Sequence, residues 1–179
     1  MHYASVENIS KSFGIRTLFK NISFYVEEGD KIAFVSKDPL AVTHFFDVIN
    51  AEEIADSGSY EWGTTVTKGY LPVEHNQFFT GGMNLMDWLR QYVPDHVTDA
   101  DEPFIRGFLG KMLFSGDDIM KKTNVLSGGE KVRCMVSRMM MQNPNCIILD
   151  QPTNHLDLES IQSFNEQCIA YSGVVLLTS

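Results

Sequence analysis

The feature that most constrains this chain is the sequence Leu-Ser-Gly-Gly-Glu at residues 126–130. Ser127 is a favourable N-cap residue, and Glu130, three positions later, completes a capping box. A helix is therefore expected to begin here, with free backbone N–H groups and the positive end of its dipole at the first turn. Such a helix end attracts phosphate. Gly128 and Gly129 are expected to leave room for a ligand to approach the backbone.

The residues after this start predict a long helix and then a buried strand. Apolar side chains recur at helical spacing and predict a face that packs on a core: Val132, Met135, Val136, Met139 and Met140. The apolar run at residues 146–149 follows and ends in Asp150. A carboxylate at the end of such a strand is suited to hold Mg²⁺ through water.

These motifs resemble those of the ATP-binding cassette (ABC) ATPases, in which a Leu-Ser-Gly-Gly-Gln/Glu signature stands shortly before an apolar strand, Walker B, that ends in aspartate. The ending Asn-His-Leu-Asp at residues 154–157 is typical of the soluble ABC-F class of cytoplasmic, mostly ribosome-associated ATPases. Residues 113–119 are similar to the second cassette of the YbiT-like branch of that class. A long helical arm insertion, which ABC-F proteins carry in their first cassette, is absent between phosphate loop and signature.

The resemblance covers nearly the whole chain and implies an α/β fold, a P-loop NTPase core with an N-terminal antiparallel β subdomain and a small helical signature subdomain. We expect one cassette domain over residues 1–179, with the core and β subdomain at about 1–82 and 143–179 and the helical subdomain at about 83–142. In the family a histidine usually follows the strand that ends at Thr178-Ser179, so the chain is expected to lack the family's C-terminal end.

Local patterns predict the remaining elements. Alternation and turn residues predict strands at residues 3–7, 22–27, 57–63, 66–72 and 173–178, and a buried strand at 31–35 followed by a helix at 40–49. Capping residues predict three more helices, after Asn84, around Pro103, and after Asp157. The inward face of the last is expected to carry Leu158, Ile161, Phe164 and either Cys168 or Ile169.

The phosphate-binding segment departs most from the family. A P-loop needs glycines whose N–H groups wrap the phosphates, a lysine for the terminal phosphates and a Ser/Thr hydroxyl for Mg²⁺. The resemblance places this segment at Ser36, Lys37, Asp38, Pro39, Leu40, Ala41, Val42, Thr43 and His44. The family's glycines are replaced by Ser36, Pro39 and Ala41, and its lysine by Val42.

These replacements predict a weakened or dead nucleotide site that retains the shape of the loop. Without the lysine, a charge-assisted contact to the terminal phosphates is lost, and Pro39 removes a backbone donor. Thr43 alone keeps its chemistry, as a ligand of Mg²⁺. The surviving helix N-terminus is an alternative phosphate site, with Lys37 reaching in from the other end of the loop.

Three further positions bear on nucleotide chemistry. The resemblance places an adenine-stacking aromatic at Phe13, for which an ordinary apolar turn residue is the alternative. Val73 stands near where the family has a glutamine of the magnesium shell, and Gln77 is the nearest glutamine downstream. Gln151, natural or engineered, occupies the position of the general base, and its amide positions a water without accepting the proton.

Composition indicates one substantial core and a cytosolic protein. The 179 residues are 44% hydrophobic, and no apolar run approaches the roughly 18 residues that cross a bilayer. A signal-peptide pattern is also absent. The cysteines lie in apolar patterns without Cys-x-x-Cys spacing and are expected to be reduced and buried: Cys134, Cys146 and Cys168.

The formal net charge of -9 argues against a chain that coats itself on nucleic acid. Basic residues gather around the signature: Arg106, Lys111, Lys121, Lys122, Lys131, Arg133 and Arg138. We interpret them as a solvated helical face that balances nearby acids, with an RNA-contacting patch as the alternative.

ABC cassettes work in head-to-tail pairs that hold ATP between one cassette's phosphate loop and the other's signature. The resemblance therefore implies ATP and Mg²⁺ as cofactors and another cassette as partner, either the N-terminal half of the same protein or a second copy. We expect this chain to donate its intact signature to ATP bound by that partner, while its own site hydrolyses ATP weakly or not at all. The ribosome or its RNA is a further partner by resemblance. A transporter's nucleotide-binding domain and a structural dimerisation domain are the alternatives.

Overall fold

Three antiparallel strands open the chain in the computed structural model, which describes residues 2–178. Strands β1 (Ala4–Phe13), β2 (Arg16–Val26) and β4 (Ser57–Trp62) form a sheet in the order β2-β1-β4. Gly14 turns the chain between β1 and β2 at a φ of +60°, which glycine adopts without strain. The strands expected at residues 3–7 and 22–27 are confirmed, and both are longer than their apolar alternation indicated.

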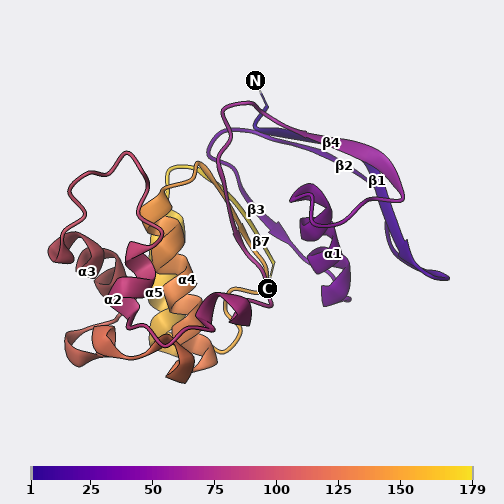
Figure 1. The fold of residues 1–179 in the computed structure, drawn as a ribbon. Helices are drawn as coiled ribbons and strands as arrows, with labels where there is room; N and C mark the ends of the chain where they lie inside the picture. Colours follow the sequence, from indigo (N-terminus) through magenta and orange to yellow (C-terminus); the bar gives the residue numbers. More distant parts are fainter. Residues whose placement is uncertain (1, 179) are drawn as a thin grey trace. The chain divides into compact units, whose positions relative to one another are not determined.

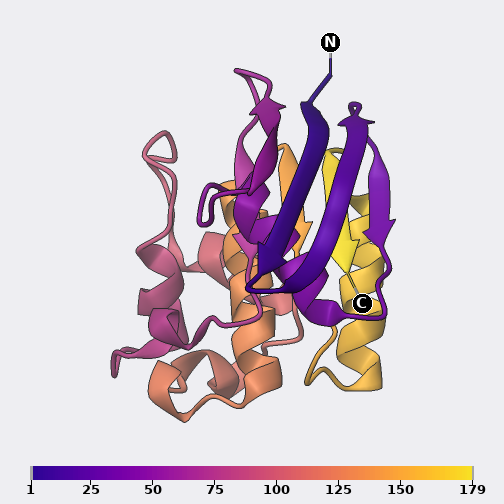
Figure 2. The same ribbon diagram turned by 90° about the vertical axis from the view of Figure 1, so that its right-hand side faces the viewer.

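Four parallel strands form a second sheet, in the order β3-β7-β6-β5. Its strands are β3 (Lys31–Phe34), β5 (Lys68–Leu71), β6 (Cys146–Leu149) and β7 (Val174–Thr178). Every residue of β6 is buried, as expected for a central parallel strand. The expectation of a buried strand at residues 31–35 is wrong in part, because β3 pairs only with β7 and alternates between exposed and half-buried residues. Figure 2 shows β3 at the side of this sheet.

Helix α1 (Pro39–Ile49) supplies the core between the two sheets. Phe45, Phe46 and Ile49, which the sequence places on one side of the helix, are at most 2% exposed. They share one hydrophobic cluster with side chains of β1, β6 and β7. Figure 1 shows α1 lying between the three-stranded sheet and strands β3 and β7. The helix that follows the phosphate-binding segment is therefore held by its apolar face.

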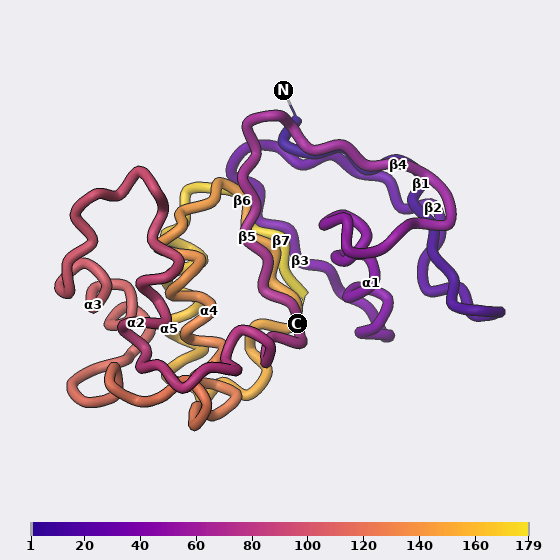
Figure 3. The backbone as a smooth tube through the Cα atoms, in the orientation of Figure 1, coloured from indigo at the N-terminus to yellow at the C-terminus, as the bar shows by residue number. Residues whose placement is uncertain are grey.

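The remaining helices carry the signature. They are α2 (Leu85–Arg90), α3 (Glu102–Lys111), α4 (Gly128–Gln142) and α5 (Leu158–Ala170), with short 3₁₀ turns at Asn76–Phe79, Gly116–Met120 and Thr123–Val125. The expected N-caps Asn84, Ser127 and Asp157 are confirmed, each accepting a backbone N–H of the first turn. Helices α2, α3 and α4 pack on one another, and Figure 3 shows their backbones grouped together.

Some side chains face differently from the sequence prediction. Near the C-terminal end of α4, Met139 and Met141 are buried, while Met140 is half-buried. In α5, Leu158 and Ile169 are 83% and 82% exposed, so the inward face is carried by Phe164 with partial burial of Ile161 and Cys168. A periodic pattern assigns a face only to within about one residue, and packing partners decide the rest.

Contacts divide the chain into two compact units. One consists of Met1–Val73, Asn145–Pro152 and Ser172–Ser179, the other of Glu74–Pro144 and Thr153–Tyr171. Residues 74–82 and α5, which the sequence analysis placed with the α/β core, thus group with the helices. One contact of this kind joins the Ser163 hydroxyl of α5 to the Lys111 carbonyl of α3 at 3.0 Å.

Among the described residues, no helix has the length and apolarity that crossing a membrane requires. The expectation about the chain's end at Ser179 lies outside the described residues.

Candidate functional site

Helix α4 begins with the complete capping box that the sequence predicts. The Ser127 hydroxyl accepts the backbone N–H of Glu130 at 3.3 Å, and the Glu130 carboxylate accepts the N–H of Ser127 at 2.8 Å. Each side chain thereby satisfies a donor that the helix end leaves open. The first turn of the signature helix is therefore fixed by its own residues.

Lys121 adds an ion pair to this box. Its ammonium lies 2.9 Å from Glu130 Oε1 and 2.8 Å from Asp118 Oδ1. Burial alone would raise the pKa of Glu130, but the hydrogen bonds from Lys121 and Ser127 outweigh it and hold that pKa below its usual value. Glu130 therefore stays ionised at neutral pH and remains engaged with these partners.

The two signature glycines lie against the segment that precedes α5. A Cβ built on Gly129 would lie 2.5 Å from the His155 carbonyl oxygen, and one built on Gly128 would lie 3.4 Å from the His155 side chain. His155 itself adopts a left-handed conformation, with a φ of +66°. In this structure the space expected for a ligand at Gly129 is used by the backbone of His155. No pattern in the sequence predicts this approach, because it depends on a contact between residues that are far apart in the chain.

The phosphate-binding segment places a carboxylate at the N-terminus of α1. Asp38 Oδ1 accepts the N–H of Leu40 at 3.3 Å, while the N–H of Asp38 donates to the Ser36 hydroxyl at 3.0 Å. Asp38 Oδ2 lies 2.6 Å from the Arg16 guanidinium. Pro39 occupies the first turn, where its missing N–H removes no helical hydrogen bond. The chain's own carboxylate thus occupies the helix end that favours an anion.

The middle of the segment turns inward. Ala41 and Val42 are 6% and 7% exposed, and Val42 belongs to the hydrophobic cluster of the core. The position aligned with the family's lysine is therefore a packing position in this chain. Lys37 and Leu40 are exposed. The alternative in which Lys37 contacts a phosphate stays a prediction.

Asp150 follows β6 and is 1% exposed. Among the described residues, no hydrogen bond reaches either of its carboxylate oxygens. Burial raises the pKa of Asp150, and the charge of Asp47 raises it further. The Thr43 hydroxyl beside the carboxylate has the opposite effect and lowers this pKa. A buried carboxylate without partners is costly unless a cation compensates it. The pair of Thr43 and Asp150 therefore fits the Mg²⁺ ligation that the sequence predicts.

The other predicted positions lie near these groups within the same unit. Gln151 has a φ of +48°, uncommon for a residue with a side chain, so the backbone after Asp150 is constrained. Phe13 is 67% exposed at the end of β1, with its ring centroid 5.8 Å from that of His44. This exposure is compatible with both interpretations of Phe13. Val73 is half-buried just after β5, where it offers no polar group.

A polar network around α1 was missed by the sequence analysis. His44 Nδ1 lies 2.7 Å from Glu53 Oε2, and Lys11 lies 3.1 Å from Glu53 Oε1. The Tyr70 hydroxyl donates to Asp47 at 2.9 Å. The only signal in the sequence was the spacing of His44 and Asp47, three residues apart on one helix face.

Comparisons with known proteins bear on this geometry. A family model described as ABC transporter matches residues 19–154. The chain belongs to this ABC family of ATP-binding domains. It is 50% identical over 175 residues to the "Uncharacterized ABC transporter ATP-binding protein YkpA" of Bacillus subtilis (strain 168), covering 97% of this chain and 32% of that protein.

Two further relatives extend the comparison. The chain is 36% identical over 174 residues to the "Probable ATP-binding protein YbiT" of Escherichia coli O157:H7, covering 97% of this chain and 32% of the relative. It is 28% identical over 181 residues to the "Ribosome protection protein VmlR" of Bacillus subtilis (strain 168), covering 99% of this chain and 31% of the relative. The chain thus spans about a third of the length of these curated relatives.

Solved structures confirm the fold class. A putative ABC transporter ATP-binding protein from Pyrococcus furiosus superposes with a TM-score of 0.81 at 16% identity, covering 98% of this chain and 90% of that one. The likeness to this structure shows the fold alone. The α/β core with an antiparallel β subdomain and a helical subdomain, expected from the sequence, is therefore the fold of this family.

Proposed function

We propose that this chain is a nucleotide-binding cassette of a soluble, cytoplasmic ABC-F protein that presents its signature helix to ATP held by a partner cassette. Its own nucleotide site is degenerate. The observation that carries the proposal is a contrast between two helix ends. At the N-terminus of α4 the capping box is complete, with the two glycines between its residues. The N-terminus of α1 is instead occupied by the carboxylate of Asp38.

The Asp38 carboxylate opposes phosphate binding at α1. A phosphate approaching this helix end meets a negative charge that already accepts the N–H of Leu40 and pairs with Arg16. Two like charges about 4 Å apart repel by roughly 1 kcal/mol in water and several-fold more near a protein surface. Val42, packed in the core, supplies no compensating cation. Weak binding of ATP by the isolated chain follows.

The residues that remain suit Mg²⁺ better than hydrolysis. When bound with ATP, Mg²⁺ neutralises phosphate charge, and the Thr43 hydroxyl and Asp150 carboxylate would hold it. Gln151 is able to orient a water through its amide but has no basic group to take up the proton. We therefore assign ATP turnover to the full-length protein and little or none to this half-site.

The name of one relative supports a ribosomal target. YbiT is called an ATP-binding protein and VmlR a ribosome protection protein, so we propose the ribosome as the target of the full-length protein. The net charge of -9 makes this cassette a poor candidate for the part that contacts RNA. Its partner would be another cassette, the N-terminal half of the same protein or a second copy.

Titration calorimetry and size-exclusion chromatography test the proposal. We expect MgATP to bind the isolated chain with millimolar affinity or weaker. The chain should then be mixed with a cassette of the family that has a complete phosphate loop and whose general base is changed from Glu to Gln. We expect this mixture to give dimers that depend on ATP. Ser127→Arg should abolish these dimers, because arginine replaces the N-cap and crowds the helix end. Ser115→Arg is the control, since Ser115 is exposed and its side chain makes no capping bond.

Two outcomes would refute the proposal. Micromolar binding of MgATP to the isolated chain would show that Asp38 and Val42 do not disable its phosphate loop. Dimers that form without ATP, or that tolerate Ser127→Arg as well as Ser115→Arg, would favour the structural dimerisation domain.

A further inference from the structure

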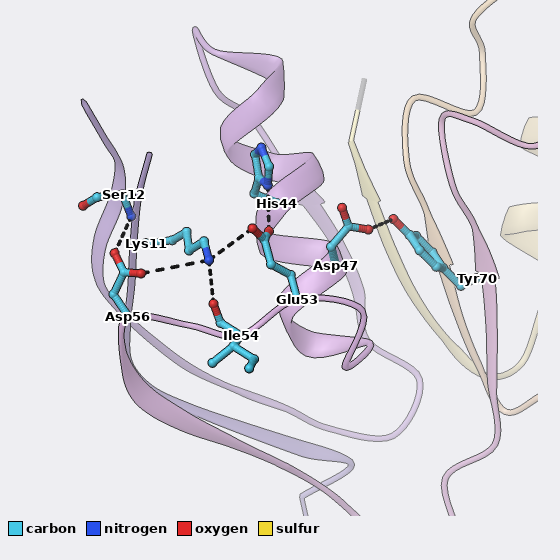
Figure 4. Close-up of polar contacts among 8 residues, drawn as sticks. All are labelled: Lys11, Ser12, His44, Asp47, Glu53, Ile54, Asp56 and Tyr70. Atoms are coloured by element: carbon cyan, nitrogen blue, oxygen red, sulfur yellow. Dashed lines mark hydrogen bonds and ion pairs between the residues drawn. The ribbon is translucent and has the colours of Figure 1, made fainter. Parts of the chain in front are cut away.

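Three side chains with metal-binding atoms converge beside α1. They are His44 and Asp47 of α1 and Glu53, which follows the helix, and one ligand atom from each lies within 4.8 Å of the other two. Figure 4 shows the imidazole of His44 and the carboxylate of Glu53 facing each other, with Asp47 on the same helix. His44 and Asp47 share a face because residues three apart on a helix are neighbours.

A second group orients each of the two carboxylates. The Tyr70 hydroxyl donates to Asp47 Oδ1 at 2.9 Å, and Lys11 lies 3.1 Å from Glu53 Oε1. The other oxygen of Glu53, Oε2, is the one that lies 2.7 Å from His44 Nδ1. Outer partners of this kind hold the ligands of known metal sites in place. The cluster therefore has both a set of donors and the contacts that orient them.

The charge around these donors is not balanced by the chain itself. Burial and the charges of Glu53 and Glu52 raise the pKa of Asp47, against the lowering effect of the Tyr70 hydrogen bond. The nearby cations are Lys68, whose ammonium interacts with the charge of Glu52, and Lys11, which is shared. The Lys11 ammonium also lies 4.0 Å from Asp56 and donates to the Ile54 carbonyl at 2.6 Å. Four carboxylates, those of Asp47, Glu52, Glu53 and Asp56, therefore face two lysines, and a divalent cation would offset the remaining negative charge.

We propose that His44, Asp47 and Glu53 form a binding site for a divalent transition metal of the Zn²⁺ class. One imidazole nitrogen with two carboxylate oxygens is a donor set that suits Zn²⁺, while Mg²⁺ and Ca²⁺ prefer oxygen alone. Donors at about 2.0–2.2 Å from a tetrahedral ion lie roughly 3.4 Å apart. The cluster reaches that spacing when His44 Nδ1 and Glu53 Oε2, now 2.7 Å apart, separate slightly, so that their hydrogen bond is exchanged for two bonds to the metal, and Asp47 moves closer to both.

The site is separate from the donation of the signature. It uses no residue of α4, and its ligands differ from Thr43 and Asp150, the pair assigned to Mg²⁺. Tyr70 links β5 to Asp47 of α1, and Lys11 links β1 to Glu53, in the segment that follows α1. A metal here would stabilise the first unit through His44, the last residue of the phosphate-binding segment, and through two residues outside that segment, Asp47 and Glu53.

Calorimetric titration of the chelator-treated chain with ZnCl₂ tests the proposal, with Co²⁺ absorption spectra as a second readout of the donor set. We expect one equivalent of Zn²⁺ to bind with micromolar affinity and Co²⁺ to give the visible bands of a nitrogen- and oxygen-ligated ion. Asp47→Asn should weaken Zn²⁺ binding at least about tenfold while retaining an oxygen that accepts from Tyr70. His44→Ala should do the same, and His96→Ala, at an exposed histidine outside the cluster, should leave the affinity unchanged.

Circular dichroism of each variant confirms that a loss of affinity is not a loss of fold. Zn²⁺ affinity weaker than about 1 mM in the unmodified chain would overturn the proposal and leave the cluster as an ion-pair network. Equal affinity in the unmodified chain, Asp47→Asn and His44→Ala would overturn it as well, by placing the metal elsewhere.

Discussion

Replacing Gly129 by alanine tests how the signature helix meets the segment at His155. The new Cβ would lie 2.5 Å from the His155 carbonyl oxygen, whereas carbon and oxygen normally approach to about 3.3–3.6 Å. The helix or the segment must therefore move by about 1 Å, and the atom in the way is backbone rather than a flexible side chain. Overpacking of this kind costs about 1–3 kcal/mol, against a gain of at most about 1 kcal/mol from the higher helix propensity of alanine.

Gly128 provides a matched control in the same turn. A Cβ there meets the His155 side chain at 3.4 Å, an ordinary contact, so Gly128→Ala should be neutral or stabilising. We expect Gly129→Ala to be less stable than Gly128→Ala by about 2 kcal/mol, the overpacking cost that Gly128 avoids. Urea unfolding followed by far-UV circular dichroism measures the difference. Equal stabilities within about 0.5 kcal/mol would refute the close approach of His155.

Three further predictions concern the two helix ends and a buried thiol. Glu130→Gln should lower the free energy of unfolding at pH 7 by up to about 1 kcal/mol, because the ion pair with Lys121 is lost. The pKa of Glu130 is lowered in the native state, so the stability difference between the two proteins should vanish as the pH falls through this pKa. Urea unfolding at several pH values measures it. Asp38→Ala should cost about 1 kcal/mol in urea unfolding, since it removes the N-cap of α1, whereas Arg16→Ala, on an exposed partner, should cost less than about 0.5 kcal/mol. Burial raises the pKa of Cys146 to about 12, so iodoacetamide at pH 8 should leave this thiol unmodified in the native chain and alkylate it in urea, as mass spectrometry would show.

The helix starts were predictable because capping is a local interaction. Ser127, Asn84 and Asp157 each accept a backbone N–H within three residues, so sequence spacing alone carries the geometry. The face of a helix was less predictable. Met140 and Leu158 satisfied the apolar period, but the neighbours that would bury them are supplied by residues far away in the sequence.

The candidate functional site was also only partly predictable from the sequence. The sequence alone shows Val42 and Gln151 at the positions where the resemblance places a lysine and a carboxylate, because the type of a side chain needs no structure. That Val42 packs in the core, and that Asp38 both caps α1 and pairs with Arg16, required the fold. The cluster of His44, Asp47 and Glu53 also depends on it, since Glu53 reaches the helix only after the chain turns.

The sequence by itself determined the capping box at Ser127 and Glu130, the buried strand that ends in Asp150, and the valine, Val42, at the position where the family resemblance places a lysine. Each of these depends on residues close together in the chain or on the chemistry of a single side chain. Only the tertiary structure decided what occupies the two helix ends. At α4 the His155 carbonyl fills the space beside Gly129, and at α1 the Asp38 carboxylate is held by Arg16. Both arrangements arise from contacts across 22 or more positions, and no local pattern encodes them.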